Sequence, residues 1–182
     1  MLEQRTLLEL AAQGQMPLSS DCIVEIGLWM CDALGSAGKW PHDLSLSNVR
    51  VICDSGIVQG VELPVPVEGT RCVLTEDIAS CMSRERACGL ACDVRADLYS
   101  VGCILFELAE GRPLFVGDLQ DVLMKHVIVT PPRPRRAMPA LMAIIRCLIE
   151  KEPSDRYQTV EELRDALYAV LDDGQSSSRS AA

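Results

Sequence analysis

Long apolar runs are missing from this sequence. One of the longest, residues 101–106, is far shorter than the ~20 apolar residues that a membrane-spanning helix needs. The first five residues, M-L-E-Q-R, lack the charged and then apolar layout of a signal peptide. With 48% hydrophobic and 24% charged residues, the composition is that of an ordinary globular chain. We therefore expect one cytoplasmic domain with a hydrophobic core.

Metal-binding patterns are scarce as well. The chain has nine cysteines but no C-x-x-C pair, and it has only two histidines. The nearest approach to a zinc-ligand spacing is Cys88-x-x-x-Cys92, so we expect no metal site. Several cysteines fall at apolar helical positions, where a thiol acts as a small core residue. Free thiols in a reducing cytosol are the simplest interpretation.

Positive charge is also in short supply. The formal net charge is −9, with 17 basic against 26 acidic residues. An acidic surface repels phosphate backbones, so nucleic acid is not an expected partner. The local exception is R-P-R-R at residues 133–136. We interpret it as a solvated loop, and contact with an anion or an acidic partner is the alternative.

Apolar residues at helical spacing predict a mainly α fold. Helices are expected over residues 2–13, about 22–34, 94–110, 118–128, 137–150 and 159–172. The 94–110 helix is apolar on most sides, which places it in the middle of the domain. Asp93 caps its start and Gly111 stops it. The last helix opens on Thr159-x-x-Glu162, a capping box.

One small β-hairpin interrupts the helices. Residues 49–52 and 57–61 have the character of short strands, and Asp54-Ser55-Gly56 supplies turn chemistry between them. Residues 63–80 contain two prolines and show no period, so a loop is expected there. Residues 173–182 are Ser-rich, and we expect a disordered tail.

Asp43 and Asn48 form a D-x-x-x-x-N pattern in the polar loop before the hairpin. A carboxylate and a carboxamide at this spacing can converge on one site. There the first could accept a hydroxyl proton and the second could bind a magnesium ion. Both residue types are common in loops, so capping of the turn is the simpler role. The pattern alone leaves both roles open.

Three further segments carry motifs that are specific when they occur together. Residues 93–115 read D-V-R-A-D-L-Y-S-V-G-C-I-L-F-E-L-A-E-G-R-P-L-F, residues 153–157 read P-S-D-R-Y, and residues 82–85 read M-S-R-E. Their order and separations resemble the F-helix signature, the late P-x-x-R segment and the end of the activation segment of bacterial serine/threonine protein kinases. The resemblance implies a protein-kinase-like C-lobe over residues 1–172, a helical bundle around a central buried helix.

The resemblance also implies structural roles for three charged residues. Asp97 would bury its carboxylate against backbone N–H groups near His42 and Asp43 and so hold that loop. Glu85 would form a partly buried, bidentate ion pair with Arg156. Both contacts would build the lobe whether or not it catalyses.

Departures from the family pattern are equally informative. The chain begins near the family's helix D, so the N-lobe with its Gly-rich phosphate loop and strand-borne lysine is not expected. The catalytic-loop H-R-D motif reads P-H-D at residues 41–43, and Ser45 stands where the family has a phosphate-binding lysine. The metal-binding D-F-G motif aligns with E-L-P at residues 62–64, where the longer Glu62 side chain would misplace a metal.

We therefore expect a catalytically impaired pseudokinase that acts as a protein-binding or regulatory module without a cofactor. Asp43 would be a vestigial base, Asn48 a vestigial magnesium position and Glu62 a doubtful metal position. Without an N-lobe, apolar surface on the first helices and hairpin would be exposed and favour a protein partner. That partner would be another kinase, a kinase substrate or a second copy.

Two other functions stay open at this point. In the first, the chain is a serine/threonine protein kinase that uses Mg-ATP, with its N-lobe supplied in trans or encoded upstream. Asp43 would then be the base and Asn48 a magnesium ligand. In the second, the chain is a decaying remnant with no selected role.

Overall fold

The computed structural model describes residues 2–10, 12, 16–37, 43–54, 57–64 and 74–179. Its helices are α1 (Leu7–Leu10), α2 (Ser20–Ala37), α3 (Glu76–Ser80), α4 (Arg84–Ala87), α5 (Val94–Glu110), α6 (Leu119–Ile128), α7 (Pro139–Leu148) and α8 (Val160–Arg179). Its strands are β1 (Leu2–Thr6), β2 (Arg50–Asp54) and β3 (Ile57–Glu62). A short 3₁₀ turn spans Pro153–Asp155.

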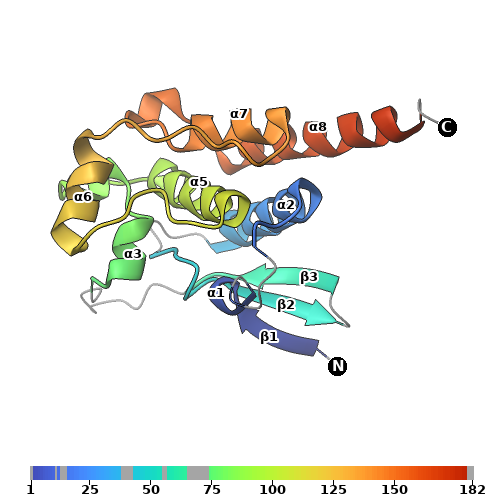
Figure 1. Ribbon diagram of the computed structural model, residues 1–182, viewed down its shortest axis with the longest axis horizontal. Helices are drawn as coiled ribbons and strands as arrows, with labels where there is room; N and C mark the ends of the chain where they lie inside the picture. Colours follow the sequence, from blue (N-terminus) through green and yellow to red (C-terminus); the bar gives the residue numbers. More distant parts are fainter. Residues whose placement is uncertain are drawn as a thin grey trace.

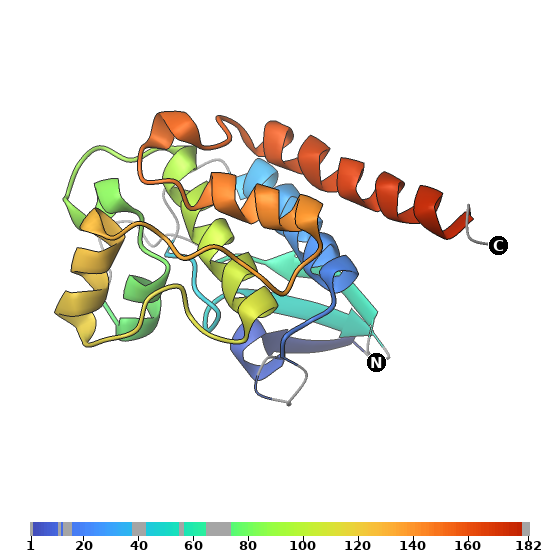
Figure 2. The ribbon, with the colours of Figure 1, turned by 45° about the horizontal axis from the view of Figure 1, so that its top comes forward.

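The elements form three layers (Figure 1). Helices α7 and α8 lie on one side, α5 and α2 occupy the middle, and the antiparallel sheet, in the order β1-β2-β3, closes the other side. Helices α3 and α6 lie together at one end. Figure 2 shows that the C-terminal part of α8 extends beyond the other layers. Within the described residues, no helix is both long and apolar enough to span a membrane.

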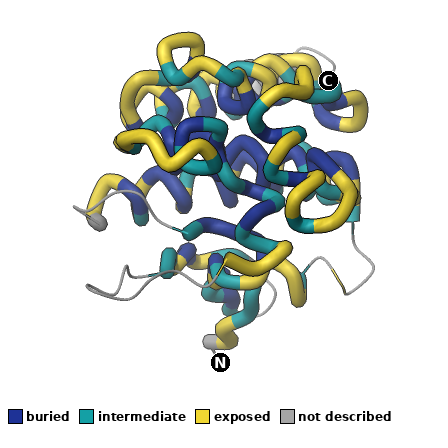
Figure 3. The backbone as a smooth tube through the Cα atoms, turned by 90° about the vertical axis from the view of Figure 1, so that its left-hand side faces the viewer, coloured by how far each residue is buried: buried dark blue, intermediate teal, exposed yellow. Residues whose placement is uncertain are grey.

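The central helix α5 begins and ends where the sequence predicts. The Asp93 side chain accepts a hydrogen bond from the Arg95 backbone N–H at 2.9 Å, and Gly111 ends the helix with a left-handed φ of 72°. Nearly all of α5 is buried, and the buried segments gather in the middle of the molecule (Figure 3). At Gly102 an added Cβ would lie 2.6 Å from Leu148 Cβ, so α5 and α7 can pack closely only because this residue is glycine.

The helix expected over residues 2–13 is wrong. Residues 2–6 form β1, which pairs antiparallel with β2 and turns the expected hairpin into a three-stranded sheet. In the described part of this segment, the α-helix spans Leu7–Leu10. Thr6 Oγ1 accepts from the Glu9 N–H at 3.1 Å, and the Glu9 carboxylate accepts from the Thr6 N–H at 2.8 Å. This reciprocal capping box starts the helix at Leu7, directly after the strand that pairs with β2.

Two other segments differ from expectation. The segment 63–80, predicted as loop, contains the short helix α3, which Thr75 caps by accepting from the Ile78 N–H at 3.2 Å. Helix α8 continues to Arg179, so the backbone of residues 173–179 is helical where a disordered tail is expected. Residues 180–182 lie outside the described part of the chain.

Candidate functional site

The loop that precedes β2 is closed by Asn48. Its Oδ1 accepts a hydrogen bond from the Ser45 N–H at 2.8 Å, and its Nδ2 donates to the Asp43 carbonyl oxygen. Leu44 and Leu46 alternate with these polar residues and are buried in the core. Both ends of the Asn48 carboxamide therefore hold the loop together, which is the capping role that the sequence left open.

The Asp43 side chain forms an ion pair with Arg86 of α4. The two side chains are 27% and 20% exposed, so the contact is shielded from water but not sealed. It is an ion pair and not an aligned hydrogen bond, because Asp43 Oδ1 has no hydrogen-bond partner among the described residues. A neighbouring cation favours the ionised form of a carboxylate and weakens it as a proton acceptor. The carboxylate of Asp43 is thus paired with a cation of the same chain.

Arg86 also links this loop to α5. Burial lowers the pKa of Arg86, whereas attraction to the charge of Asp97 and then of Cys92 raises it. Asp97 lies in the first turn of α5 and is fully buried. The expected contact of Asp97 with His42 falls on a residue outside the described part of the chain. Within the described part, Arg86 forms an ion pair with Asp43 and is attracted to the charge of Asp97.

Hydrogen-bonded hydroxyl groups lie at and next to position 45, where the resemblance implies a lysine. Ser45 is fully buried, and its Oγ lies 3.2 Å from Ser47 Oγ. The Ser47 hydroxyl also contacts the Asp77 carboxylate of α3 as a hydrogen-bond donor. These hydrogen bonds lead to the negatively charged carboxylate of Asp77. Phosphoryl transfer instead needs a positive charge near the phosphate, where negative charge develops in the transition state. The arrangement fits a structural tie between the loop and α3.

A hollow of about 430 Å³ lies beside the loop at the edge of the sheet. Its lining residues come from β1, the 43–48 loop, β2 and the end of β3: Thr6, Ser47, Asn48, Arg50, Glu62, Leu63 and Pro64. The two metal positions named from the sequence, Asn48 and Glu62, thus share one hollow. The Glu62 carboxylate accepts from Gln4 Nε2 at 3.3 and 3.4 Å. No cluster of three or more potential metal ligands is found in the described residues.

Glu85 and Arg156 meet in a different part of the molecule. Arg156 Nη1 lies 2.8 Å from Glu85 Oε1 and Nη2 lies 3.0 Å from Oε2, a bidentate pair with both side chains almost fully buried. Arg156 also donates to the carbonyl oxygens of Glu150, Arg95 and Lys151 at 2.7–2.9 Å. All five N–H donors of the guanidinium are therefore used. The pair fastens α4 to the start of α5 and to the turn before α8.

The pair also sets the charge state of Glu85. Burial acts to raise the pKa of Glu85, but the hydrogen bonds and the charge of Arg156 outweigh it and lower the pKa below its ordinary value. The Arg156 guanidinium lies 4.7 Å from the centre of the Tyr99 ring, which covers the pair from one side. The carboxylate of Glu85 and the guanidinium of Arg156 therefore balance each other's charge in the interior.

Three site features were not predicted from the sequence. Arg86 and Asp77 both reach the 43–48 loop from helices that are distant in the chain, and their spacing gives no signal of this. His126 is fully buried, with Nδ1 2.8 Å from the Tyr99 hydroxyl oxygen. The apolar residues around His126 in the sequence were the available signal for burial.

The chain is similar over most of its length to bacterial serine/threonine protein kinases. No family model matches it. It is 40% identical over 92% of its length to the probable serine/threonine-protein kinase SCO3848 of Streptomyces coelicolor. It is 33% identical over 70% of its length to serine/threonine-protein kinase PknB of Mycobacterium leprae, and 29% identical over 89% to serine/threonine-protein kinase Pkn1 of Myxococcus xanthus.

The chain spans about a quarter of the length of these relatives, 21–27%. The match to SCO3848 covers 92% of the chain and so includes the buried helix α5 and the segments that supply Glu85 and Arg156. Homology and a mainly helical fold around a buried central helix together identify the chain as a protein-kinase-like C-lobe related to the bacterial serine/threonine protein kinases.

Proposed function

We propose that this kinase-like domain is a catalytically impaired pseudokinase that works by binding other proteins. The observation that carries the proposal is the Asp43–Arg86 ion pair. A general base must be free to approach a substrate hydroxyl and take its proton. Here the carboxylate is held by a guanidinium of the same chain, and that contact would have to break before Asp43 could act.

The surroundings of Asp43 support the same conclusion. Ser45 supplies an uncharged hydroxyl where a kinase needs a cation, and the hydrogen-bonded chain from it ends on Asp77. One missing electrostatic stabiliser costs about 2.7–4 kcal/mol of transition-state stabilisation, two to three decades of rate. With the base also neutralised, transfer would fall by a larger factor, and no cofactor is expected.

A binding role is supported by exposed apolar side chains near the N-terminal end of the lobe. Leu8 of α1 and Trp29 of α2 are 47% and 37% exposed. These helices are where the sequence predicts uncovered apolar surface. The partner would be another kinase, a kinase substrate or a second copy of the chain. Nucleic acid and membrane are not expected partners, given the net charge of −9.

Two measurements on the purified chain test this proposal. We expect no shift in melting temperature on addition of Mg-ATP and no transfer of labelled phosphate from ATP to a generic protein substrate. Sedimentation and pull-down from lysate should detect self-association or a bound kinase or kinase substrate. Transfer that Asp43→Ala abolishes, and that Arg164→Gln on α8 leaves intact, would overturn the proposal.

One observation favours the alternative, an active serine/threonine kinase that uses Mg-ATP. Asn48 and Glu62 line one hollow, so two residues with potential magnesium ligands lie near each other, although the Asn48 carboxamide closes the loop and Glu62 accepts from Gln4. The Arg86→Gln variant examines this alternative directly, because it releases Asp43. A Mg-dependent rise in melting temperature with ATP in that variant would support the alternative. An unchanged melting curve would count against it.

A further inference from the structure

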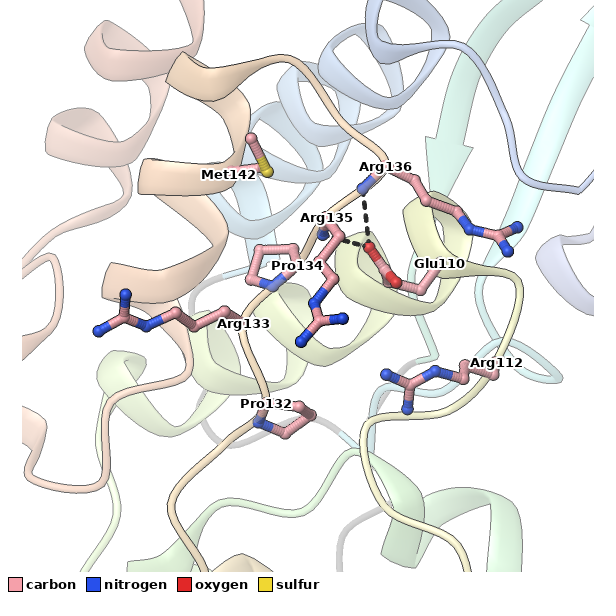
Figure 4. Close-up of a pocket in the computed structure, with 8 residues that line it drawn as sticks. All are labelled: Glu110, Arg112, Pro132, Arg133, Pro134, Arg135, Arg136 and Met142. Atoms are coloured by element: carbon pink, nitrogen blue, oxygen red, sulfur yellow. Dashed lines mark hydrogen bonds between the residues drawn. The ribbon is translucent and has the colours of Figure 1, made fainter.

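A broad groove lies between the C-terminal end of α5 and the segment that joins α6 to α7 (Figure 4). Its volume is about 820 Å³. Eight residues line it: Glu110, Arg112, Pro132, Arg133, Pro134, Arg135, Arg136 and Met142. Arg112 follows α5, and the other three arginines come from the 130–138 segment. Two segments that are distant in the sequence therefore supply four arginines to the lining of one groove, and Figure 4 shows the Arg133 and Arg136 side chains extending away from those of Arg112 and Arg135.

The one carboxylate in the groove is already engaged. Glu110 is almost fully buried, and its Oε1 accepts from the backbone N–H groups of Arg135 at 2.5 Å and Arg136 at 3.0 Å. It therefore holds the backbone of the segment and does not pair with a guanidinium. In the part of the chain that the structure describes, none of the four arginine side chains forms an ion pair. Arg112 instead lies 5.3 Å from the centre of the Phe106 ring.

The segment is shaped to present these arginines. Pro131, Pro132 and Pro134 restrict its backbone, and Pro134 is buried beneath the exposed side chains of Arg133 and Arg135. Figure 4 shows the Arg112 and Arg135 side chains reaching into the groove from its two walls, with Glu110 between them. A stiff segment tied to α5 loses little conformational freedom when it binds a ligand.

The charge and the residue type together indicate the ligand. Four of the 17 basic residues lie in this groove, on a chain whose net charge is −9. All four are arginines, whose planar guanidinium forks match phosphate oxygens in a bidentate manner. A long polyanion or an anionic membrane would also meet the acidic remainder of the surface and be repelled. A peptide with one phosphate group meets only the groove.

We propose that this groove binds a phosphorylated segment of a partner protein, with phosphoserine or phosphothreonine held by Arg112 and Arg135. The inference deepens the binding role proposed above and rests on it by naming a class of partner. The groove lies at the opposite end of α5 from Asp97, about 20 Å along the helix axis at 1.5 Å per residue. Occupancy of the groove therefore needs no contact with the 43–48 loop.

Fluorescence anisotropy with a labelled acidic peptide that carries one central phosphoserine tests the proposal. We expect the phosphopeptide to bind at least tenfold more tightly than its unphosphorylated serine twin. Inorganic phosphate should compete at high concentration, and binding should weaken as salt rises. Equal affinity for the two peptides, or no binding of the phosphopeptide, would overturn the proposal. So would tighter binding of anionic vesicles or of an oligonucleotide.

Variants locate the binding site. Arg112→Gln with Arg135→Gln removes two charge-assisted contacts and should weaken phosphopeptide binding tenfold or more. Arg112→Lys with Arg135→Lys keeps the two positive charges but loses the bidentate guanidinium geometry. Its affinity for the phosphopeptide should lie between that of the wild type and that of the double glutamine variant. The matched control is Arg164→Gln on α8, which should leave affinity unchanged. Unchanged affinity in the double glutamine variant would place binding elsewhere and overturn the proposal.

Two checks keep the result unambiguous. Circular dichroism melting shows whether the double variant folds, and Arg133→Gln replaces it if it does not, with a smaller expected loss of affinity. The ATP-transfer assay with Asp43→Ala is run on the same preparations. Transfer with phosphopeptide binding intact would overturn the pseudokinase role alone. Absence of both transfer and peptide binding would overturn the groove alone.

Discussion

Glu85 and Arg86 are neighbours on the short helix α4, yet their ion pairs lie in different surroundings. The Glu85–Arg156 pair is bidentate and almost completely buried, and every guanidinium donor has a partner. The Asp43–Arg86 pair is half-buried, and Asp43 Oδ1 makes no hydrogen bond to a described residue. The Glu85–Arg156 pair holds α4 against the start of α5 and the turn before α8. The Asp43–Arg86 pair occupies a position where the family's catalytic chemistry would take place.

The comparison separates folding from catalysis. A buried charge that loses its partner lowers the stability of the fold strongly. The packing of α4 against α5 and the turn before α8 therefore depends on Glu85 and Arg156. The Asp43–Arg86 pair is partly exposed to water, so its loss should cost less stability than the loss of the buried pair. A chain of this kind can retain a kinase-like fold while its catalytic positions change.

The largest expected effect comes from breaking the buried pair. Arg156→Met leaves the Glu85 carboxylate buried without its cation and should lower the free energy of unfolding by about 3–5 kcal/mol. Urea denaturation followed by circular dichroism measures it. The double variant with Glu85→Gln should lose less than the sum of the two single variants, because they share one interaction. A loss of unfolding free energy below about 1 kcal/mol would show that the Glu85–Arg156 pair contributes little to the stability of the fold.

The second expected effect is a pH dependence of the free energy of unfolding, which comes from the buried His126. Burial, with a further contribution from the charge of Lys151, lowers the pKa of His126 to about 3. Below pH 6.5 the unfolded chain takes up a proton at this imidazole and the folded chain does not. The associated stability is therefore complete above pH 6.5 and is lost as pH falls toward 3.

Between pH 7 and pH 5 this loss should amount to about 2 kcal/mol relative to His126→Gln. The comparison with that variant is needed because Glu107 acts in the opposite direction. Burial and the charge of Asp77 raise the pKa of Glu107 to about 7, so its contribution is lost as pH rises from 4.5 through 7. Parallel pH profiles for the wild type and His126→Gln would contradict the assignment to His126.

A smaller effect is expected at the half-buried pair. Arg86→Gln should cost about 1–2 kcal/mol in urea denaturation, because Asp43 can turn to water once its partner is lost whereas the buried Asp97 loses the attraction of a nearby cation. A cost as large as that of Arg156→Met would mean that the two pairs are equivalent. The contrast between folding and catalysis would then disappear.

The smallest effect belongs to Arg84, the residue before Glu85 on α4. Arg84 forms an ion pair with Glu152, but the two side chains are 39% and 57% exposed. Water and salt screen such pairs, and Arg84→Ala should change the free energy of unfolding by less than about 0.5 kcal/mol. The variant serves as a control for Arg156→Met, because it removes an arginine from the same region. A larger loss would show that exposure does not govern the ranking.

Local sequence was a good guide where one rule dominated. The limits of α5 follow from Asp93, Gly111 and an apolar surface on most sides, and the structure confirms them. Helices α6 and α7 also lie within the predicted ranges. The segment 2–13 failed because its leucines fit a helix, while strand pairing with β2 draws residues 2–6 into the sheet. Propensity gives way where a long-range partner is available.

The sequence by itself determined the fold class, the buried central helix and the relationship to kinases, because these depend on spacing and on motifs that are contiguous in the chain. Only the tertiary structure decided that Arg86 faces Asp43, that Ser47 reaches Asp77, and that Arg112 joins the arginines of the 130–138 segment. These contacts join residues from separate elements. Their formation depends on how the helices pack, which no local pattern encodes.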